Sequence, residues 1–128
     1  MNAPQSSQAM AALFNLPADE RYVYFVSEIA GQRKVWTLAG PGGFVAFCDE
    51  DGHDCFPFWP APDLAETVAD ADWSDCRAEA LDLDVFMSRW LRGMARDGRL
   101  VSVFPAPDGT GIVVDPLELL DDLQAELG

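Results

Sequence analysis

The stretch FCDEDGHDCFPFWP, from Phe47 to Pro60, decides how the middle of the chain folds. It sets an acidic, glycine-containing segment between two apolar runs, GFVAFC at 43–48 and CFPFW at 55–59. A short gap that contains glycine between two such runs is typical of a β-hairpin. We therefore predict a hairpin with Gly52 in its turn. Pro57 has no N–H to donate, which favours an edge or a bulge for the second strand.

The same stretch contains the only histidine and two of the three cysteines, so a metal site and thiol chemistry are the alternatives to a plain turn. Cys48, His53 and Cys55 are spaced C-x4-H-x-C, which matches no common zinc pattern. The segment also departs from a calcium loop, because Gly52 is the fourth residue from Asp49 and not the sixth. A disulfide between Cys48 and Cys55 fits a hairpin that sets them opposite each other, but a reducing compartment disfavours it. We expect no metal and no other cofactor.

Nothing in the sequence identifies a reaction. His53 is of a residue type that serves as a general base, but a turn tip next to Gly52 does not hold an imidazole in one orientation. The GPGG segment at 40–43 joins two strands and does not open a helix, so it lacks the helix dipole that binds phosphate. The sequence shows no P-loop and no dinucleotide-binding motif. It therefore predicts no catalytic residue and leans away from an enzyme.

Strand and helix periods alternate along the rest of the chain. KVWTLA at 34–39 has the period of a strand and precedes the run at 43–48, and 100–104 and 112–114 form a second hairpin with PDG at its tip. A brief extended piece is expected near Ala80. Strands joined by such short turns are antiparallel.

Apolar residues three and four positions apart predict five helices. The predicted ranges are Ser6–Leu16, Pro17–Gly31, Ala61–Asp70, Leu83–Arg96 and a last helix that begins at Asp115 and Pro116. Asp82 and Asp115 are expected to cap the last two helices, and Gly31 to end the second. In the last helix we expect one side to be buried, with Leu117, Leu120, Leu123 and Leu127, and the other to be exposed, with Glu118, Asp121, Asp122 and Glu126.

This order of elements predicts a single α+β domain over residues 1–128. Its mostly antiparallel sheet has about five strands, in two hairpin or meander units, and about four to five helices pack on it. Residues 1–16 are the segment expected to pack most loosely.

The net charge narrows the kinds of partner. The chain has 22 acidic and eight basic residues, which gives a formal charge of −14. Nucleic acids and anionic membranes bind to clusters of Lys and Arg, so neither is expected as a partner. A basic protein partner fits this charge, although solubility alone also explains it. We expect the protein to be cytoplasmic. The sequence shows no basic, apolar leader and no long apolar stretch, and its cysteine count is odd.

The predicted meander is apolar on both faces, so either helices cover both or a partner covers one. The candidate surface contains Trp36, Phe56, Phe58 and Trp59, together with the hairpin acids Asp49, Asp51 and Asp54. Large exposed apolar patches mark interfaces, so a protein partner or a homodimer is expected if the helices leave this face open.

Three arginines are also candidates. Arg89, Arg92 and Arg96 fall within roughly 60° of one another on a helix with about 100° per residue. They are either a solvated face or an anchor for a carboxylate-bearing partner or a second copy of the chain.

Two functions remain open from the residues alone. The first is a non-enzymatic interaction domain, for example one that neutralises a basic toxin as immunity proteins do. The alternative is a small-molecule binder or minor enzyme, with a pocket between the sheet and the long helix that is lined by Trp36, Trp59 and Trp90.

The sequence resembles a bacterial family known as domain of unknown function 2750. The resemblance rests on ERYVYFVSEIAGQRKVWTL, GGFVAFCDEDGHDCFPFWP, FMSRWLRGMARDG and VFPAPDGTGIVVDPLELLDDL, with the PFWP element and the last hairpin as its most specific parts. It implies a small intracellular α+β domain and brings no activity, cofactor or catalytic residue.

Overall fold

Two small sheets that meet at one point form the centre of the molecule. The computed structural model describes residues 7–48, 51–107 and 111–128. The first sheet has the order β2-β1-β5, with strands β1 (Lys34–Gly40), β2 (Gly43–Phe44) and β5 (Arg77–Asp82). The second has the order β3-β4-β6-β7, with strands β3 (Phe47–Cys48), β4 (Asp54–Phe58), β6 (Leu100–Val103) and β7 (Ile112–Val114). All pairings are antiparallel except β4 with β6. The predicted α+β class with a mostly antiparallel arrangement is confirmed.

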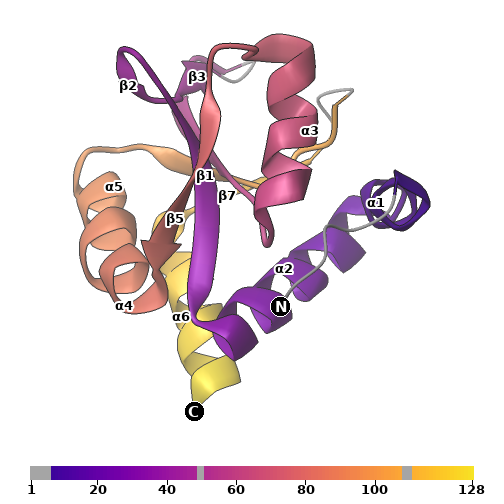
Figure 1. Ribbon diagram of the computed structural model, residues 1–128. Coiled ribbons are helices and arrows are strands. Elements are labelled where there is room, and N and C mark those ends of the chain that lie inside the picture. Colours follow the sequence, from indigo (N-terminus) through magenta and orange to yellow (C-terminus); the bar gives the residue numbers. More distant parts are fainter. Residues whose placement is uncertain (1–6, 49–50, 108–110) are drawn as a thin grey trace.

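Helices cover both sheets. They are α1 (Ser7–Phe14), α2 (Ala18–Gln32), α3 (Pro62–Asp72), α4 (Leu83–Val85), η1 (Phe86–Leu91), α5 (Arg92–Arg96) and α6 (Pro116–Leu127). The segments α4, η1 and α5 follow one another without a break, and we call them the long helix. Helix α3 packs on β1 and β5, whereas α2 packs against α6 and on β6 and β7 (Figure 1). No helix in the described ranges is both long enough and apolar enough to cross a membrane.

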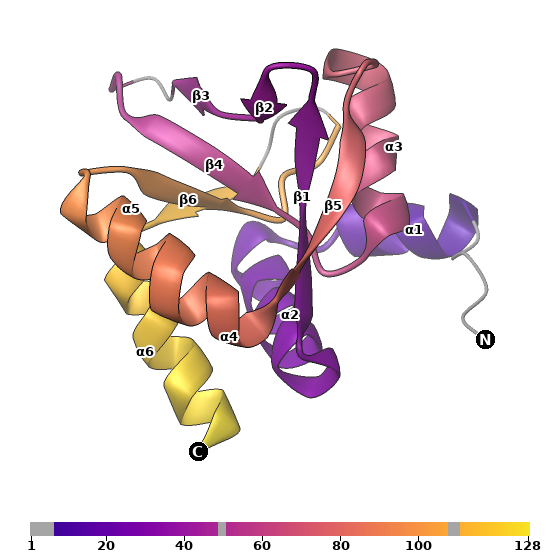
Figure 2. The same cartoon turned by 60° about the vertical axis from the view of Figure 1, so that its left-hand side comes forward.

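Among the described residues, one pair of backbone hydrogen bonds joins the two sheets. The Trp36 N–H donates to the Trp59 carbonyl at 3.0 Å, and the Trp59 N–H donates to the Trp36 carbonyl at 2.8 Å. The Thr37 hydroxyl adds a bond of 2.8 Å to the Pro57 carbonyl. Figure 2 shows the end of β4 reaching the middle of β1 at this junction. Trp36, Thr37, Pro57 and Trp59 therefore connect the two halves of the fold.

Pro57 explains why the pairing of β1 with β4 stops after one step. In an antiparallel pair, hydrogen-bonded positions recur every second residue, so Leu38 and Pro57 would be the next to exchange bonds. Pro57 has no N–H, and the Leu38 carbonyl instead accepts from Val45 at 2.9 Å. The two strands diverge from there, and the segment at 43–48 fills the wedge between them.

The segment at 43–48 is therefore not the single strand that the sequence predicted. Its first part pairs with β1 through Gly43 and Phe44, and its last part pairs with β4 through Phe47 and Cys48. The predicted three-stranded meander is wrong, since these strands are divided between two sheets. The parallel pairing of β4 with β6 was also not predicted, because nothing local in the sequence marks it.

Several helix ends differ from the predicted ones. Helix α2 continues past Gly31 to Gln32, and Arg33 ends it in the left-handed conformation with φ of 64°. Asp82 precedes the long helix but makes no side-chain capping bond. The prediction for Asp115 is confirmed, because its carboxylate accepts from the Leu117 N–H at 2.8 Å.

Helix α6 buries a different set of leucines from the one predicted. Leu119, Leu120 and Leu123 are buried, but Leu117 is 46 % exposed and Leu127 is 37 % exposed. The packing of α6 on α2, η1 and α5 sets this face, and the spacing of the leucines alone does not reveal it. The predicted burial of Leu117 and Leu127 is therefore wrong.

The junction gives the first testable prediction. Replacing Thr37 by Val keeps the shape of this fully buried side chain but leaves the Pro57 carbonyl without its donor. An unsatisfied buried acceptor costs about 1–3 kcal/mol, so the free energy of unfolding in urea should fall by that amount.

Thr67→Val is the matched control for Thr37→Val. The Thr67 hydroxyl donates to the Asp63 carbonyl within helix α3, where the backbone ladder already uses that carbonyl. The control should change stability by less than about 0.5 kcal/mol. Equal losses for the two variants would contradict a special role of the junction.

Candidate functional site

The acidic hairpin is a solvent-exposed turn in the part that the structure describes. Asp51, Gly52, His53 and Asp54 are all exposed, and Gly52 has the positive φ of 84° that a turn glycine supplies. Asp49 lies outside the described residues. Among the described residues, no three His, Cys, Asp or Glu side chains gather in a way that could hold a metal ion.

The hairpin does not set Cys48 opposite Cys55. Cys48 faces Asp54, and Cys55 faces Phe47. The backbone register therefore differs from the one in which the sequence left a disulfide open. Cys55 is a fully buried free cysteine.

The aromatic residues singled out in the sequence divide into buried and half-buried ones. Phe58 and Trp59 are fully buried, and the Trp59 indole N–H donates to the Pro105 carbonyl at 2.9 Å. The expectation that both belong to an exposed surface, and that Trp59 lines a ligand pocket, is therefore wrong. Trp36 and Phe56 are half-buried.

Phe56 is covered partly by the protein's own side chains. Its ring lies 6.0 Å from the ring of Trp90, centroid to centroid, and the Arg99 guanidinium lies 5.3 Å above it. Trp90 also meets Phe44 and Phe58 edge to face. These aromatic contacts connect β2 and β4 to the long helix. They also cover part of the Phe56 ring, which leaves it little surface for a partner.

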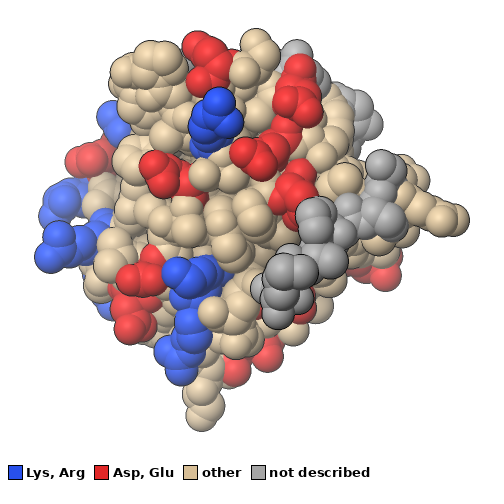
Figure 3. All heavy atoms as spheres, viewed as in Figure 1, with Lys and Arg blue, Asp and Glu red and all other residues tan. Residues whose placement is uncertain are grey.

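The three arginines of the long helix are exposed, which both readings of the sequence require. Lys and Arg gather at the left edge of Figure 3, on the side where Figure 1 places α5. Asp and Glu instead form a column over α3 on the same face of the molecule. On this face the acidic residues over α3 therefore lie apart from the basic residues at the left edge.

Strand β5 forms an outer edge of the first sheet. It pairs with β1 on one side, and no described strand pairs with its other side. The Leu83 N–H donates to the Arg33 carbonyl at 3.0 Å. Because hydrogen-bonded positions recur every second residue in an antiparallel pair, the odd-numbered residues of β5 are the ones whose backbone groups bond to β1. The backbone N–H and C=O groups of Ala78 and Ala80 consequently point outward.

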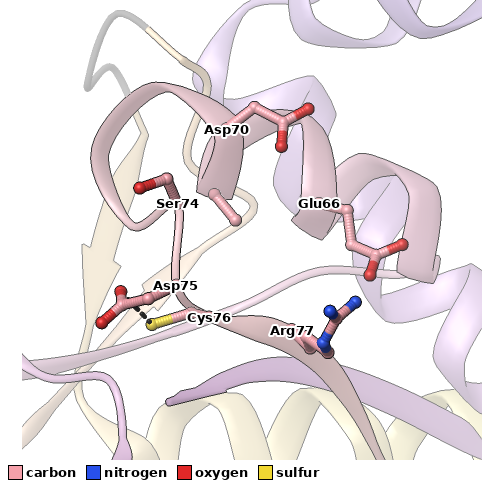
Figure 4. Close-up of a pocket in the computed structure, with 7 residues that line it drawn as sticks. Glu66, Asp70, Ser74, Asp75, Cys76 and Arg77 are labelled. Carbon is pink, nitrogen blue, oxygen red and sulfur yellow. Dashed lines mark hydrogen bonds between the residues drawn. The ribbon is translucent and has the colours of Figure 1, made fainter. Parts of the chain in front are cut away.

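An acidic pocket adjoins the start of this edge. It has a volume of about 340 Å³ and lies between α3 and the residues that lead into β5. Glu66, Asp70 and Asp75 supply its negative charge, and Arg77 supplies its one positive charge. In Figure 4 the Glu66 and Arg77 side chains extend into the same opening from α3 and β5, while Asp75 lies beside Cys76. We call this pocket and the outer edge of β5 the β5 edge site.

Cys76 lies in the pocket but has the wrong electrostatics for a nucleophile. Desolvation and then the neighbouring Asp75 carboxylate raise the pKa of the Cys76 thiol, whose Sγ donates to Asp75 Oδ1 at 3.7 Å. A raised pKa keeps the thiol protonated, whereas thiol catalysis needs the thiolate. A Cβ atom at Gly40 would lie only 2.9 Å from the Cys76 Sγ, so the glycine allows β1 to pass this side chain closely.

The β5 edge site combines two means of recognition. Outward backbone groups can pair with an added strand, and carboxylates beside them attract a cationic side chain. Helix α3 provides Glu66 and Asp70 one turn apart, on a flank next to its buried residues Leu64 and Ala69.

Sequence reasoning did not find this site. The brief extended piece near Ala80 was predicted, but its place at the end of a sheet depends on contacts that are distant in sequence. The signal that could have pointed to it is the pair Glu66 and Asp70, which share one exposed helix face above an acidic turn at Asp75.

Comparison with known proteins gives one finding. A family model described as Protein of unknown function (DUF2750) matches residues 22–123, which include the whole β5 edge site. No curated protein matches the sequence. The family description names no activity, substrate or partner.

The electrostatics of the pocket predict slow alkylation of the Cys76 thiol. Asp75→Asn removes the charge that helps to raise the pKa of the thiol, so more thiolate should form near neutral pH. Alkylation of Cys76 by iodoacetamide at pH of about 7.5 should then become several-fold faster, as followed by mass spectrometry of the Cys76 peptide.

The buried Cys55 serves as an internal reference in the same samples, and its labelling should not change. An unchanged rate at Cys76 would show that Asp75 does not influence the thiol. Labelling by wild type should accelerate as the pH rises, because the thiolate fraction grows toward the raised pKa.

Proposed function

We propose that this chain, which belongs to the DUF2750 family of proteins of unknown function, is a non-enzymatic domain that binds a basic protein segment at the β5 edge site. The segment adds as a strand to the outer edge of β5 and places a Lys or Arg side chain in the acidic pocket. Neutralisation of a basic toxin is one concrete form of such a role.

The observation that carries this proposal is the outer edge of β5 itself. Natural sheets usually protect long edges, because exposed N–H and C=O groups pair readily with another chain. Ala78 and Ala80 have short side chains at the positions whose backbone groups point outward. A strand can therefore approach without steric conflict from bulky neighbours.

Charge selects the partner. Glu66, Asp70 and Asp75 outnumber Arg77 in the pocket, and the chain as a whole carries a formal −14. This field attracts a basic segment from a distance and repels an acidic one. A second copy of this acidic chain is consequently a poor occupant of this particular site.

The test uses a synthetic peptide as the partner. A fluorescein-labelled peptide of roughly eight alternating Lys and Thr residues matches the length of a strand and presents all its lysines on one face. We expect saturable binding by fluorescence anisotropy. The affinity should fall about tenfold or more as the salt rises from about 0.05 M to about 0.5 M, because salt screens exposed charges.

Two variants separate the two parts of the site. Ala80→Pro removes an outward N–H that β1 does not use, so the protein should fold while peptide affinity falls at least about tenfold. Glu66→Gln with Asp70→Asn should weaken binding about threefold to tenfold, as expected for partly screened charge pairs.

The matched control removes two charges elsewhere. Glu28→Gln with Glu126→Gln lies on exposed positions of α2 and α6 and should leave the peptide affinity within about twofold of wild type. If Ala80→Pro binds the peptide as wild type does, strand addition is wrong. If the control weakens binding as much as the pocket variant, the pocket has no special part in recognition.

A further inference from the structure

A second surface, separate from the β5 edge site, lies between the long helix and α6. A groove of about 290 Å³ runs along the seam between these helices, which lie side by side in Figure 2. Met87, Leu120 and Leu127 line it with apolar atoms. Asp84 and Arg92 lie along its long-helix side.

Exposed apolar side chains flank this groove. Leu127, which lines it, is 37 % exposed, and Leu117, one turn before Leu120 on α6, is 46 % exposed. Single exposed leucines are common on protein surfaces. Several beside one apolar groove are typical of a surface that another helix covers.

Charged residues of both signs surround this groove. The long helix carries the exposed Arg92 and Arg96. Helix α6 carries the exposed Asp121, one turn after Leu117 and next to Leu120 in the groove. The long-helix side of the groove is therefore positive from Arg92 onward and negative at Asp84, while α6 places Asp121 beside Leu120.

We infer that a second copy of this chain covers the groove, with a two-fold axis along it. Rotation about such an axis leaves each residue at the same height along the groove but moves it to the opposite side. The long helix of each copy therefore lies against α6 of the other. Arg92 is the last long-helix residue and Leu120 the first α6 residue that line the groove, and the two helices run in opposite directions (Figure 2), so Arg92 meets the partner at the level of Leu120 and Asp121. The four helices form a bundle around the leucines.

This arrangement accounts for the leucines that α6 leaves outside the core. Leu119, Leu120 and Leu123 hold α6 to its own chain, while Leu117 and Leu127 become buried only against the other copy. The two Arg92–Asp121 pairs favour this exchange of sides, because like charges would meet if each long helix lay against the long helix of the other copy. The inference does not depend on the proposed function, since the two surfaces share no residue.

The experiment is sedimentation equilibrium of the full chain at ionic strength of about 0.15 M, where unlike surface charges still attract at contact distances. Wild type should form a dimer. Arg92→Glu and Asp121→Arg should each weaken it about tenfold or more, because each places like charges opposite each other.

Mixing the two single variants gives the decisive result. In a mixed dimer, Glu at position 92 meets Arg at position 121 on one side, and the native Arg92 and Asp121 meet on the other. The mixture should therefore dimerise within about threefold of wild type while each variant alone remains weak. A charge pair within one chain would not recover on mixing.

Val23→Gln is the matched control, because Val23 is 66 % exposed but lies on α2 outside this groove. It should leave dimerisation unchanged, whereas Leu117→Gln should weaken it. A wild type that remains monomeric up to about 1 mM, a concentration at which even weak pairs associate, overturns the inference and leaves the groove to a different partner. Failure of the mixture to recover also overturns it.

Discussion

The exchange of two backbone hydrogen bonds between Trp36 and Trp59 is the interaction on which the rest of the fold depends. It connects a sheet built around β1 to a sheet built around β4, and neither sheet alone has more than four strands. Pro57 limits the contact to one step, since it has no N–H to continue the ladder. The Trp59 side chain then anchors the junction in the core through its bond to the Pro105 carbonyl. A short contact therefore sets the angle between the two halves of the molecule.

This junction also determines which surfaces remain for partners. One side of β1 is used by β5, and the other is shared between β4 at Trp36 and the segment from Gly43 to Val45. Strand β5 is left as the outer strand beside the acidic flank of α3. On the far side, the long helix and α6 lie against each other with leucines still exposed. The two proposed surfaces follow from the same arrangement and differ in charge, so they suit different partners.

The sequence predicted those parts of the fold that local chemistry determines. The turn at Gly52 and the cap at Asp115 each follow from residues within a few positions of one another, and the β6–β7 pairing joins residues at most 13 positions apart. The division of 43–48 between two sheets follows from the exchange between Trp36 and Trp59, which are 23 positions apart, and the parallel pairing of β4 with β6 joins residues 45 positions apart. No local pattern encodes either contact. The burial of polar Arg21, whose Nη1 donates to the Phe104 carbonyl at 3.3 Å, is equally non-local. The candidate site was missed for the same reason, because tertiary packing alone makes β5 an edge.

Hydrogen exchange of the Trp36 and Trp59 amides tests the central claim most directly. If this pair joins the two sheets, both amides should exchange only when the whole protein unfolds. Their opening free energies should then equal those of the slowest amides and fall with denaturant at the same slope. If instead both amides exchange through a local opening that depends little on denaturant, while the β1 amides that bond to β5 stay protected, the junction does not hold the halves together.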